Sequence, residues 1–127
     1  MPRHPIATDR APAAIGPYSQ AVCSGAHVYT SGQIPLDPAT GALVDGDIAT
    51  QARRVFDNLQ AICAAAGSSF TDVVRVGIYL VDLADFAAVN AVMADYFAAP
   101  YPARSTVGVA SLPKGARVEI DLVLALA

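Results

Sequence analysis

The chain has 127 residues, about the size of one domain, and 54% of them are apolar while 15% are charged, which excludes a disordered chain. Polar and turn residues interrupt every apolar run before it reaches the roughly 20 residues that a membrane helix needs. The formal net charge of −3 argues against a nucleic-acid-binding surface. The N-terminal sequence MPRHPIATDR lacks the apolar segment of a signal peptide, so we expect a single cytoplasmic domain over residues 1–127.

Residue types that carry common catalytic chemistries are scarce. Cys23 and Cys63 are too few for a disulfide framework or a zinc site, and their apolar neighbours predict that each is a small core residue. His4, in a predicted N-terminal tail, and His27, beside a predicted turn, complete no Ser-His-Asp or HExxH pattern. An ionisable catalytic group must therefore come from the arginines, aspartates, tyrosines or Glu119, the only glutamate.

The first half of the chain predicts an extended entry segment over residues 12–17 and a β-hairpin with strands over residues 20–23 and 28–31. A loop over residues 35–46 and a helix over residues 47–67 follow. Asp47 is a good N-cap residue, and Gly67 is a natural C-terminal stop. Between them, apolar residues recur at helical spacing on one face: Ile48, Ala52, Val55, Phe56, Leu59, Ile62, Cys63 and Ala66.

The second half predicts a strand over residues 74–80 and a helix over residues 82–98. Two further strands follow, over residues 104–110 and 118–126. The resulting order, β-β-α-β-α-β-β, is typical of an α+β domain, and right-handed crossovers place both helices on one face of the sheet. The opposite face then carries Arg75, Tyr79, Glu119, Asp121 and Val123. It is either solvated or a subunit interface, and the high apolar content without a third helix favours the interface.

Three polar residues occupy unusual settings. Arg104 follows two prolines at the start of a strand, a rigid setting for anion capture, although a surface arginine fits there too. Glu119 lies in mid-strand, and it is either an exposed carboxylate paired with Arg117 or a group that orients a water or moves a proton. Asn90 shares the apolar face of the second helix, so its amide is predicted to be buried and bonded to a loop carbonyl or a ligand.

Two short polar segments, Gly16–Gln20 and Thr30–Pro35, lie at predicted strand ends. Gly32, which has no side chain, would let a ligand approach the backbone closely. Taken alone, each segment is better explained by a turn than by a site. The residues themselves therefore predict an α+β oligomer with an anion site, and they do not define a reaction.

These segments resemble the Rid family, the reactive intermediate deaminases also called the YjgF family. The matching stretches follow the family's order along nearly the whole chain: residues 13–21, 30–38, 51–52, 58–59, 66–67, 85–86, 89–90, 102–105, 112–113 and 118–120. The resemblance implies a chorismate-mutase-like α+β fold, assembled as a homotrimer with sites between subunits. It also implies hydrolysis of enamine and imine intermediates of the 2-aminoacrylate type to 2-keto acids and ammonia, without a metal or organic cofactor.

The resemblance assigns roles to individual residues. Arg104 matches the arginine that grips the substrate carboxylate, and Glu119 matches the carboxylate that positions the attacking water. Three further residues match positions that line the pocket: Tyr18, Gly32 and Asn90. Thr106 departs from the family because many relatives have cysteine there, so a thiol is missing while a hydroxyl can still hold water or substrate. The segment 98–101 is also short compared with several relatives, which is expected to reshape the mouth of the cleft.

Two other functions compete with imine hydrolysis. One is a non-catalytic trimer in which Arg104 captures small carboxylates for regulation, although such a module would not need Glu119 beside a bound anion because like charges repel. The other is RNA cleavage, against which the acidic net charge and the lack of tryptophan weigh. We therefore expect small imine or enamine acids as partners, and neither nucleic acid nor a membrane.

Overall fold

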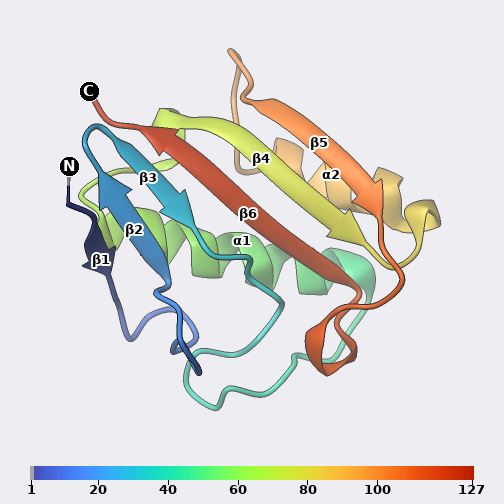
Figure 1. Cartoon of the computed structure of the whole chain (residues 1–127). Helices are drawn as coiled ribbons and strands as arrows, with labels where there is room; N and C mark the ends of the chain where they lie inside the picture. The colour runs from blue at the N-terminus through green and yellow to red at the C-terminus, as the bar shows by residue number, and fades with distance from the viewer. Residues whose placement is uncertain (1) are drawn as a thin grey trace.

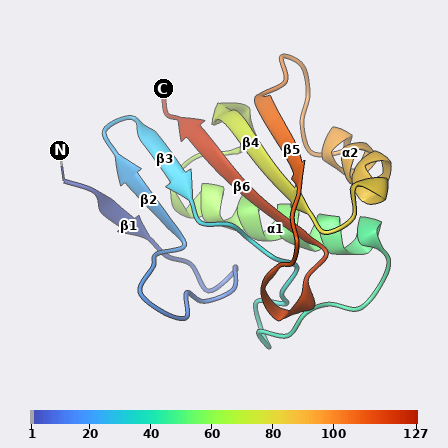
Figure 2. The same ribbon diagram turned by 45° about the vertical axis from the view of Figure 1, so that its right-hand side comes forward.

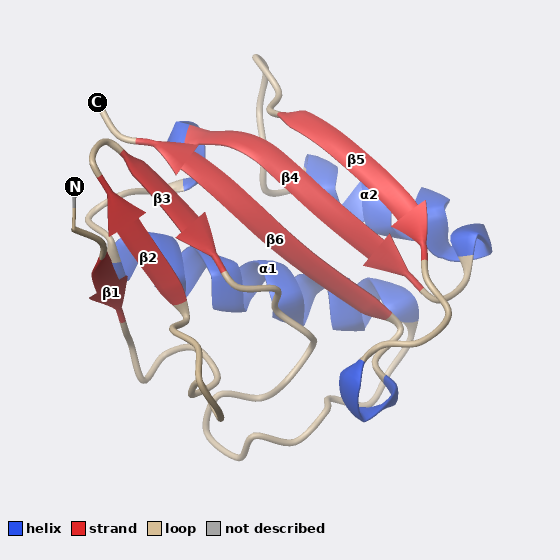
Figure 3. Cartoon of the chain, in the orientation of Figure 1, coloured by secondary structure: helices blue, strands red, loops and turns tan. Residues whose placement is uncertain are grey.

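The computed structural model describes residues 2–127, which form a six-stranded mixed sheet backed by two α-helices. The strands are, in chain order, β1 His4–Ile6, β2 Ala21–Ser24, β3 His27–Thr30, β4 Val73–Leu80, β5 Ala103–Gly108 and β6 Val118–Ala125. Across the sheet they run β1-β2-β3-β6-β4-β5; β4 and β5 are parallel and all other neighbours are antiparallel (Figures 1 and 3). The C-terminal strand β6 therefore lies inside the sheet, and β5 forms one edge.

Both helices lie on the same face of the sheet, as the crossover rule predicts (Figure 2). Helix α1, Ile48–Ala65, begins at Asp47, whose side chain accepts a hydrogen bond from the Thr50 amide at 2.8 Å. Helix α2, Phe86–Ala94, connects the parallel strands β4 and β5. Together with the mixed sheet, this arrangement confirms the predicted α+β fold class.

The core lies between the sheet and the helices. Alternate residues of β6 are almost fully buried there, and so is the apolar face of α1: Val118, Ile120, Leu122 and Leu124 with Val55, Phe56, Leu59, Ile62 and Cys63. At the C-terminal end of α2, the Phe97 ring stacks on Phe70 with ring centroids 4.7 Å apart. The Tyr96 ring stacks on Phe56 at 5.1 Å. These aromatic contacts fix the end of α2 against α1.

The other face of the sheet carries the residues that the sequence predicts for it. Tyr79 and Glu119 are register partners on β4 and β6, and the Tyr79 hydroxyl donates a hydrogen bond to Asp121 Oδ2 at 3.0 Å. Burial of its hydroxyl and this bond to Asp121 raise the pKa of Tyr79. Several large apolar side chains are exposed on this face, among them Tyr29 and Val107.

Several expectations need correction. His4 lies not in a tail but in β1, an edge strand of three residues. The strand was not predicted because it contains Pro5 and is too short to show an alternation of polar and apolar residues. The predicted helix over residues 82–98 is shorter, because Asp82 caps a 3₁₀ turn, Leu83–Asp85, that precedes α2. Of the two cysteines, Cys63 is buried as predicted, whereas Cys23 is only half-buried against the core.

Within residues 2–127, no helix combines the length and the apolar character needed to cross a membrane.

Candidate functional site

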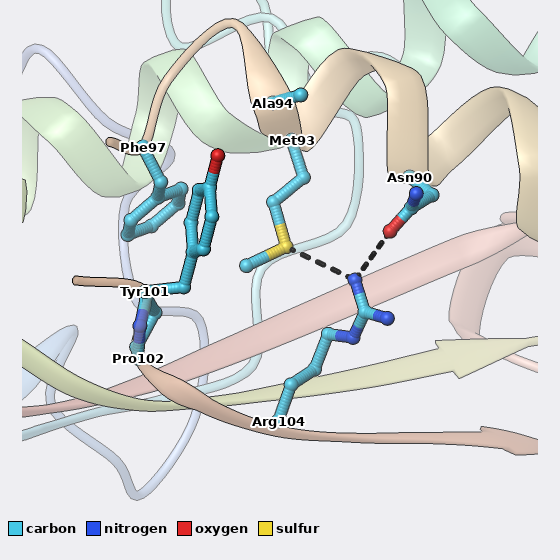
Figure 4. Close-up of a pocket in the computed structure, with 7 residues that line it drawn as sticks. All are labelled: Asn90, Met93, Ala94, Phe97, Tyr101, Pro102 and Arg104. Carbon is cyan, nitrogen blue, oxygen red and sulfur yellow. Dashed lines mark hydrogen bonds between the residues drawn. The ribbon is translucent and has the colours of Figure 1, made fainter. Parts of the chain in front are cut away.

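Arg104 lies on the edge strand β5 and is held by three side chains of α2. Its Nη1 donates to Asn90 Oδ1 at 2.6 Å and contacts Met93 Sδ at 3.6 Å (Figure 4). The guanidinium also lies over the Phe86 ring, 5.2 Å from its centroid. One nitrogen of the guanidinium is therefore fixed, while its Nε and Nη2 make no hydrogen bond within the described residues.

A cavity of about 470 Å³ opens beside this guanidinium. It is lined by Asn90, Met93, Ala94, Phe97, Tyr101, Pro102 and Arg104. The expectation that the Asn90 amide is buried was wrong: Asn90 is exposed at the cavity, and its partner is Arg104 rather than a loop carbonyl. Helical spacing does place it on the same side of α2 as Met93, and that side faces the cavity at the edge of the core.

Glu119 lies on β6 and faces the open side of the sheet, where it is half-buried. Burial raises the pKa of its carboxyl group, and the nearby Asp121 carboxylate raises it further. The alternative of a pair with Arg117 is wrong, because Arg117 Nη2 donates to the carbonyl of Gly46 at 2.8 Å. Within residues 2–127 the Glu119 carboxylate has neither an ion pair nor a hydrogen bond.

Gly32 makes room for this carboxylate. A Cβ atom at position 32 would lie 2.7 Å from Glu119 Cδ, closer than side chains pack, so only glycine leaves Glu119 where it is. The backbone next to Gly32 is fixed by two hydrogen bonds between Gln33 and Ile120, at 2.8 and 3.1 Å. Gly32 therefore provides the space that the Glu119 side chain occupies. From the sequence, this space was expected to be used by a ligand that approaches the backbone.

A second cavity, of about 430 Å³, brings together Tyr18, Gly32 and Glu119. The Tyr18 side chain is half exposed, and its hydroxyl accepts a hydrogen bond from the Ile15 amide at 3.3 Å. Lys114, the only lysine, also lines this cavity, and its ammonium donates to the carbonyl of Gly41 at 3.2 Å. The predicted site residues therefore fall into two groups, one around Arg104 and one around Glu119.

The two groups lie on opposite faces of the sheet. Arg104 is the register partner of Val76, which is buried under the helices, whereas Glu119 is the partner of the half-buried Tyr79 on the open face. Thr106 is on the helix side with Arg104 but does not line its cavity, and its buried hydroxyl has no hydrogen-bond partner within the described residues. One chain therefore does not bring Arg104 and Glu119 to a common point.

Sequence reasoning missed the apolar wall of the first cavity and the lysine of the second. Met93, Ala94 and Phe97 follow Asn90 at helical spacings of three, four and seven residues, so the pattern itself could have placed them together. Lys114 stands out in the sequence as the only lysine, but nothing in the pattern connects it to Glu119.

The arrangement suits a small carboxylic acid. The free edge of the Arg104 guanidinium can bind a carboxylate through two parallel hydrogen bonds. The Glu119 carboxylate, which has a raised pKa and no ion pair within the described residues, can accept a proton from a water and direct that water.

The chain resembles known proteins over nearly its full length. The sequence model of the family described as Endoribonuclease L-PSP matches residues 8–126. The chain is 54% identical to Protein DfrA of Myxococcus xanthus, over 97% of this chain and 95% of that protein. It is 48% identical to the 2-iminobutanoate/2-iminopropanoate deaminase of Dermatophagoides farinae, over 98% of each. The crystal structure of RidA from the Antarctic bacterium Psychrobacter sp. PAMC 21119 matches with a TM-score of 0.93 and 51% identity, over 97% of this chain and 99% of that one.

Proposed function

The chain belongs to the Endoribonuclease L-PSP family and, within it, to the Rid proteins, and on this premise we propose that it is an imine deaminase. Its substrates are 2-imino acids and their enamine tautomers, and its products are 2-keto acids and ammonia. The name of the Dermatophagoides farinae relative, which is 48% identical, states this activity for 2-iminobutanoate and 2-iminopropanoate.

The reaction is a hydrolysis in which only water is consumed. The water oxygen bonds to the imine carbon, and one of its protons goes to the nitrogen. The proton that remains on the added hydroxyl then also goes to the nitrogen, the carbon–nitrogen bond breaks, ammonia leaves, and a carbon–oxygen double bond forms. Because an imine is already electrophilic, the protein has to hold the substrate and aim the water, and well-oriented reactants can lower a barrier by about 7–11 kcal/mol.

Arg104 and Glu119 divide these two tasks. The free edge of the Arg104 guanidinium binds the substrate carboxylate, and Asn90 and Met93 keep that guanidinium in place. Glu119 accepts a hydrogen bond from the attacking water and takes its proton. Tyr18 and Gly32 shape the space around Glu119, where Gly32 is the residue that leaves room for the carboxylate.

A homotrimer would bring the two groups together. Arg104 and Glu119 point away from opposite faces of one sheet, so a complete site needs Arg104 of one subunit and Glu119 of the next. The open sheet face supports this assembly, because Tyr29 and Val107 expose nearly half of their side chains to solvent there. Association of three copies over this face would bury Tyr29 and Val107 and form three equivalent clefts.

The observation that carries the proposal is the Glu119 carboxylate, which lies half-buried in a cavity and forms no ion pair within residues 2–127. A protein that only binds small carboxylates gains nothing from such a group, because it repels the ligand. An enzyme that must direct a water needs it.

A coupled assay tests the proposal. A threonine or serine dehydratase generates 2-aminocrotonate or 2-aminoacrylate in solution, and 2-keto acid release is followed with and without this protein. We expect the protein to accelerate release and Glu119→Gln to slow it by about 10²–10⁴-fold while still binding pyruvate in a calorimetric titration. No acceleration by the parent protein, with pyruvate binding intact, would instead identify a carboxylate-binding module.

A further inference from the structure

A cluster of polar side chains on the open sheet face lies beside the Glu119 cavity. Asp121 follows Glu119 on β6 by two residues, so both side chains leave the strand on the same face, about 7 Å apart along it. Tyr79, the register partner of Glu119 on the neighbouring strand β4, donates its hydroxyl proton to Asp121 Oδ2 over 3.0 Å (Figure 3). Asp121 does not line the Glu119 cavity, and the proposed function does not use it.

Gly77 leaves the space that Asp121 occupies. It is the register partner of Asp121 on β4, and it is buried. A Cβ atom at position 77 would clash with the Asp121 carboxylate, and it would lie 3.1 Å from the Tyr79 hydroxyl and 3.2 Å from Arg75 Nη1. Three polar groups from two strands therefore converge over a residue that has no side chain. Asp121, which is half-buried, is held in a specific arrangement.

The negative charge of Asp121 acts on Glu119. The titratable and charged groups around Glu119 are Asp121 on its own strand, Tyr79 and Arg75 on β4, Tyr18 and Lys114 across the cavity, and Arg104 of the next subunit in the proposed trimer. Within residues 2–127 neither Glu119 nor Asp121 forms an ion pair, so no cation in contact with them cancels their repulsion. Burial raises the pKa of Glu119 most, and Asp121 raises it further.

A like charge beside a base makes that base stronger, because taking up a proton relieves the repulsion between the two charges. On the basis of the proposed function, we infer that Asp121, oriented by Tyr79 over Gly77, is a positioning residue that strengthens Glu119 as the acceptor of the water's proton. Asp121 lies outside the cavity, so it acts through Glu119 and not on the substrate. Removing its charge should therefore change the strength of the base and leave the base itself in place.

Glu119 can be observed directly because it is the only glutamate of the chain. Cell-free expression with glutamate that carries ¹³C at its side-chain carboxyl gives one resonance, whose chemical shift follows protonation between about pH 4 and 9. We expect the midpoint of this titration to be lower in Asp121→Asn than in the parent, because the like charge is gone. Asp45→Asn is the matched control: it removes the same charge from an exposed position outside the cavity, and its midpoint should stay as in the parent.

Kinetics on the same variants test the consequence for the reaction. With the dehydratase in constant excess and the uncatalysed rate subtracted, kcat/KM of each variant is divided by that of the parent at the same pH. For Asp121→Asn we expect kcat/KM at pH 8 to fall by about 10-fold or less, because the base remains and is only weaker. The ratio should rise as the pH falls, because Glu119 of the variant stays ionised at a lower pH. Asp121→Glu restores the charge and should restore the parent's profile.

A loss of folding or packing would lower the ratio equally at every pH. Circular dichroism checks each variant, and Asp121→Ser replaces Asp121→Asn if the latter does not fold. In a parent protein that hydrolyses imines, an unchanged Glu119 midpoint in Asp121→Asn, or a ratio that does not vary with pH, would overturn the inference and leave the proposed function intact. Equal hydrolysis by the parent and by Glu119→Gln would remove both.

Discussion

At the residue scale, Arg104 is held in a position that suits the proposed binding of a planar anion. Its Nη1 is held by Asn90 Oδ1 at 2.6 Å, and the N–H groups of its other two nitrogens match the spacing of the two oxygens of a carboxylate. A lysine ammonium is a point charge and cannot reproduce this fork. We therefore expect Arg104→Lys to lower kcat/KM nearly as much as Arg104→Ala, by about 10-fold or more, since a hydrogen bond to a charged group contributes about 1.5–3 kcal/mol.

Steady-state kinetics on both variants check this, with circular dichroism to confirm that each folds. Nearly full activity in Arg104→Lys would mean that a positive charge alone anchors the substrate or that another residue does.

Glu119 should leave a signature in the pH dependence of the rate. Its pKa is raised, first by burial and then by Asp121, so the carboxylate that we propose directs the water is protonated at a higher pH than an ordinary glutamate. We expect kcat/KM of the parent protein to fall with decreasing pH through this raised pKa. In Glu119→Gln that acid limb should be absent, and an unchanged limb in the variant would assign it to another group.

The same shift predicts how stability depends on pH. Because folding raises the pKa of Glu119, the folded state binds the proton more tightly than the unfolded state does, and ionisation of Glu119 opposes folding as the pH rises. Glu119→Gln should therefore be more stable than the parent at pH 7, and the difference should vanish below about pH 4, where the side chain is protonated in both states. Urea denaturation at the two pH values measures the difference.

At the scale of elements, helix α1 holds the loop that forms part of the Glu119 cavity. Asn58 is completely buried on α1; its Nδ2 donates to the carbonyl of Leu36 at 2.9 Å, and its Oδ1 accepts from Arg54 Nε at 3.1 Å. Leu36 lines the cavity. Asn58→Ala leaves the Leu36 carbonyl without its partner, and we expect a loss of about 1–3 kcal/mol in the free energy of unfolding.

Denaturant titration checks this value, with Gln60→Ala, an exposed position on the same helix, as the control expected to change little. Equal stability of the Asn58→Ala and Gln60→Ala variants would show that Asn58 does not hold the loop.

The elements also show which parts of the fold can be predicted from sequence. Helix α1 and strand β6 follow the predicted ranges closely, because one has a capped amphipathic pattern over five turns and the other alternates without interruption. Strand β1 is three residues long and contains a proline, so it has no pattern to detect, and β2 pairing alone makes it a strand. The ends of α2 depend on the Asp82 cap and on the packing of Phe97 against Phe70, which helical periodicity does not report.

The residues of the candidate site stand out in the sequence, whereas their geometry does not. Arg104, Asn90 and Glu119 stand out by type and setting. The side of the sheet on which Arg104 and Glu119 lie depends on strand register, however. That register places Arg104 on the helix side, under α2, and Glu119 on the open side. Asn90 was expected to be buried because its helix face is apolar, but α2 lies at the edge of the sheet and that part of its face borders a cavity.

For the whole molecule, the separation of Arg104 and Glu119 means that the proposed mechanism requires oligomerisation. We expect light scattering to give a mass about three times the 13.1 kDa of one chain. A charged residue in the open face, such as Val107→Asp, should weaken the assembly and lower activity in parallel, because it would bury an unpaired charge at the interface. A monomeric parent protein would rule out a site shared between subunits.

The most direct test mixes two inactive variants, Arg104→Ala and Glu119→Gln, by unfolding and refolding them together at equal concentrations. In the proposed trimer, each variant alone lacks one half of every cleft. In mixed trimers, a cleft that takes Arg104 from one subunit and Glu119 from the next is complete, and random assembly produces this combination at about a quarter of the clefts. We therefore predict that the mixture recovers about a quarter of the parent's imine hydrolysis while each variant refolded alone stays inactive. A mixture that forms trimers but remains as inactive as its components would contradict the account.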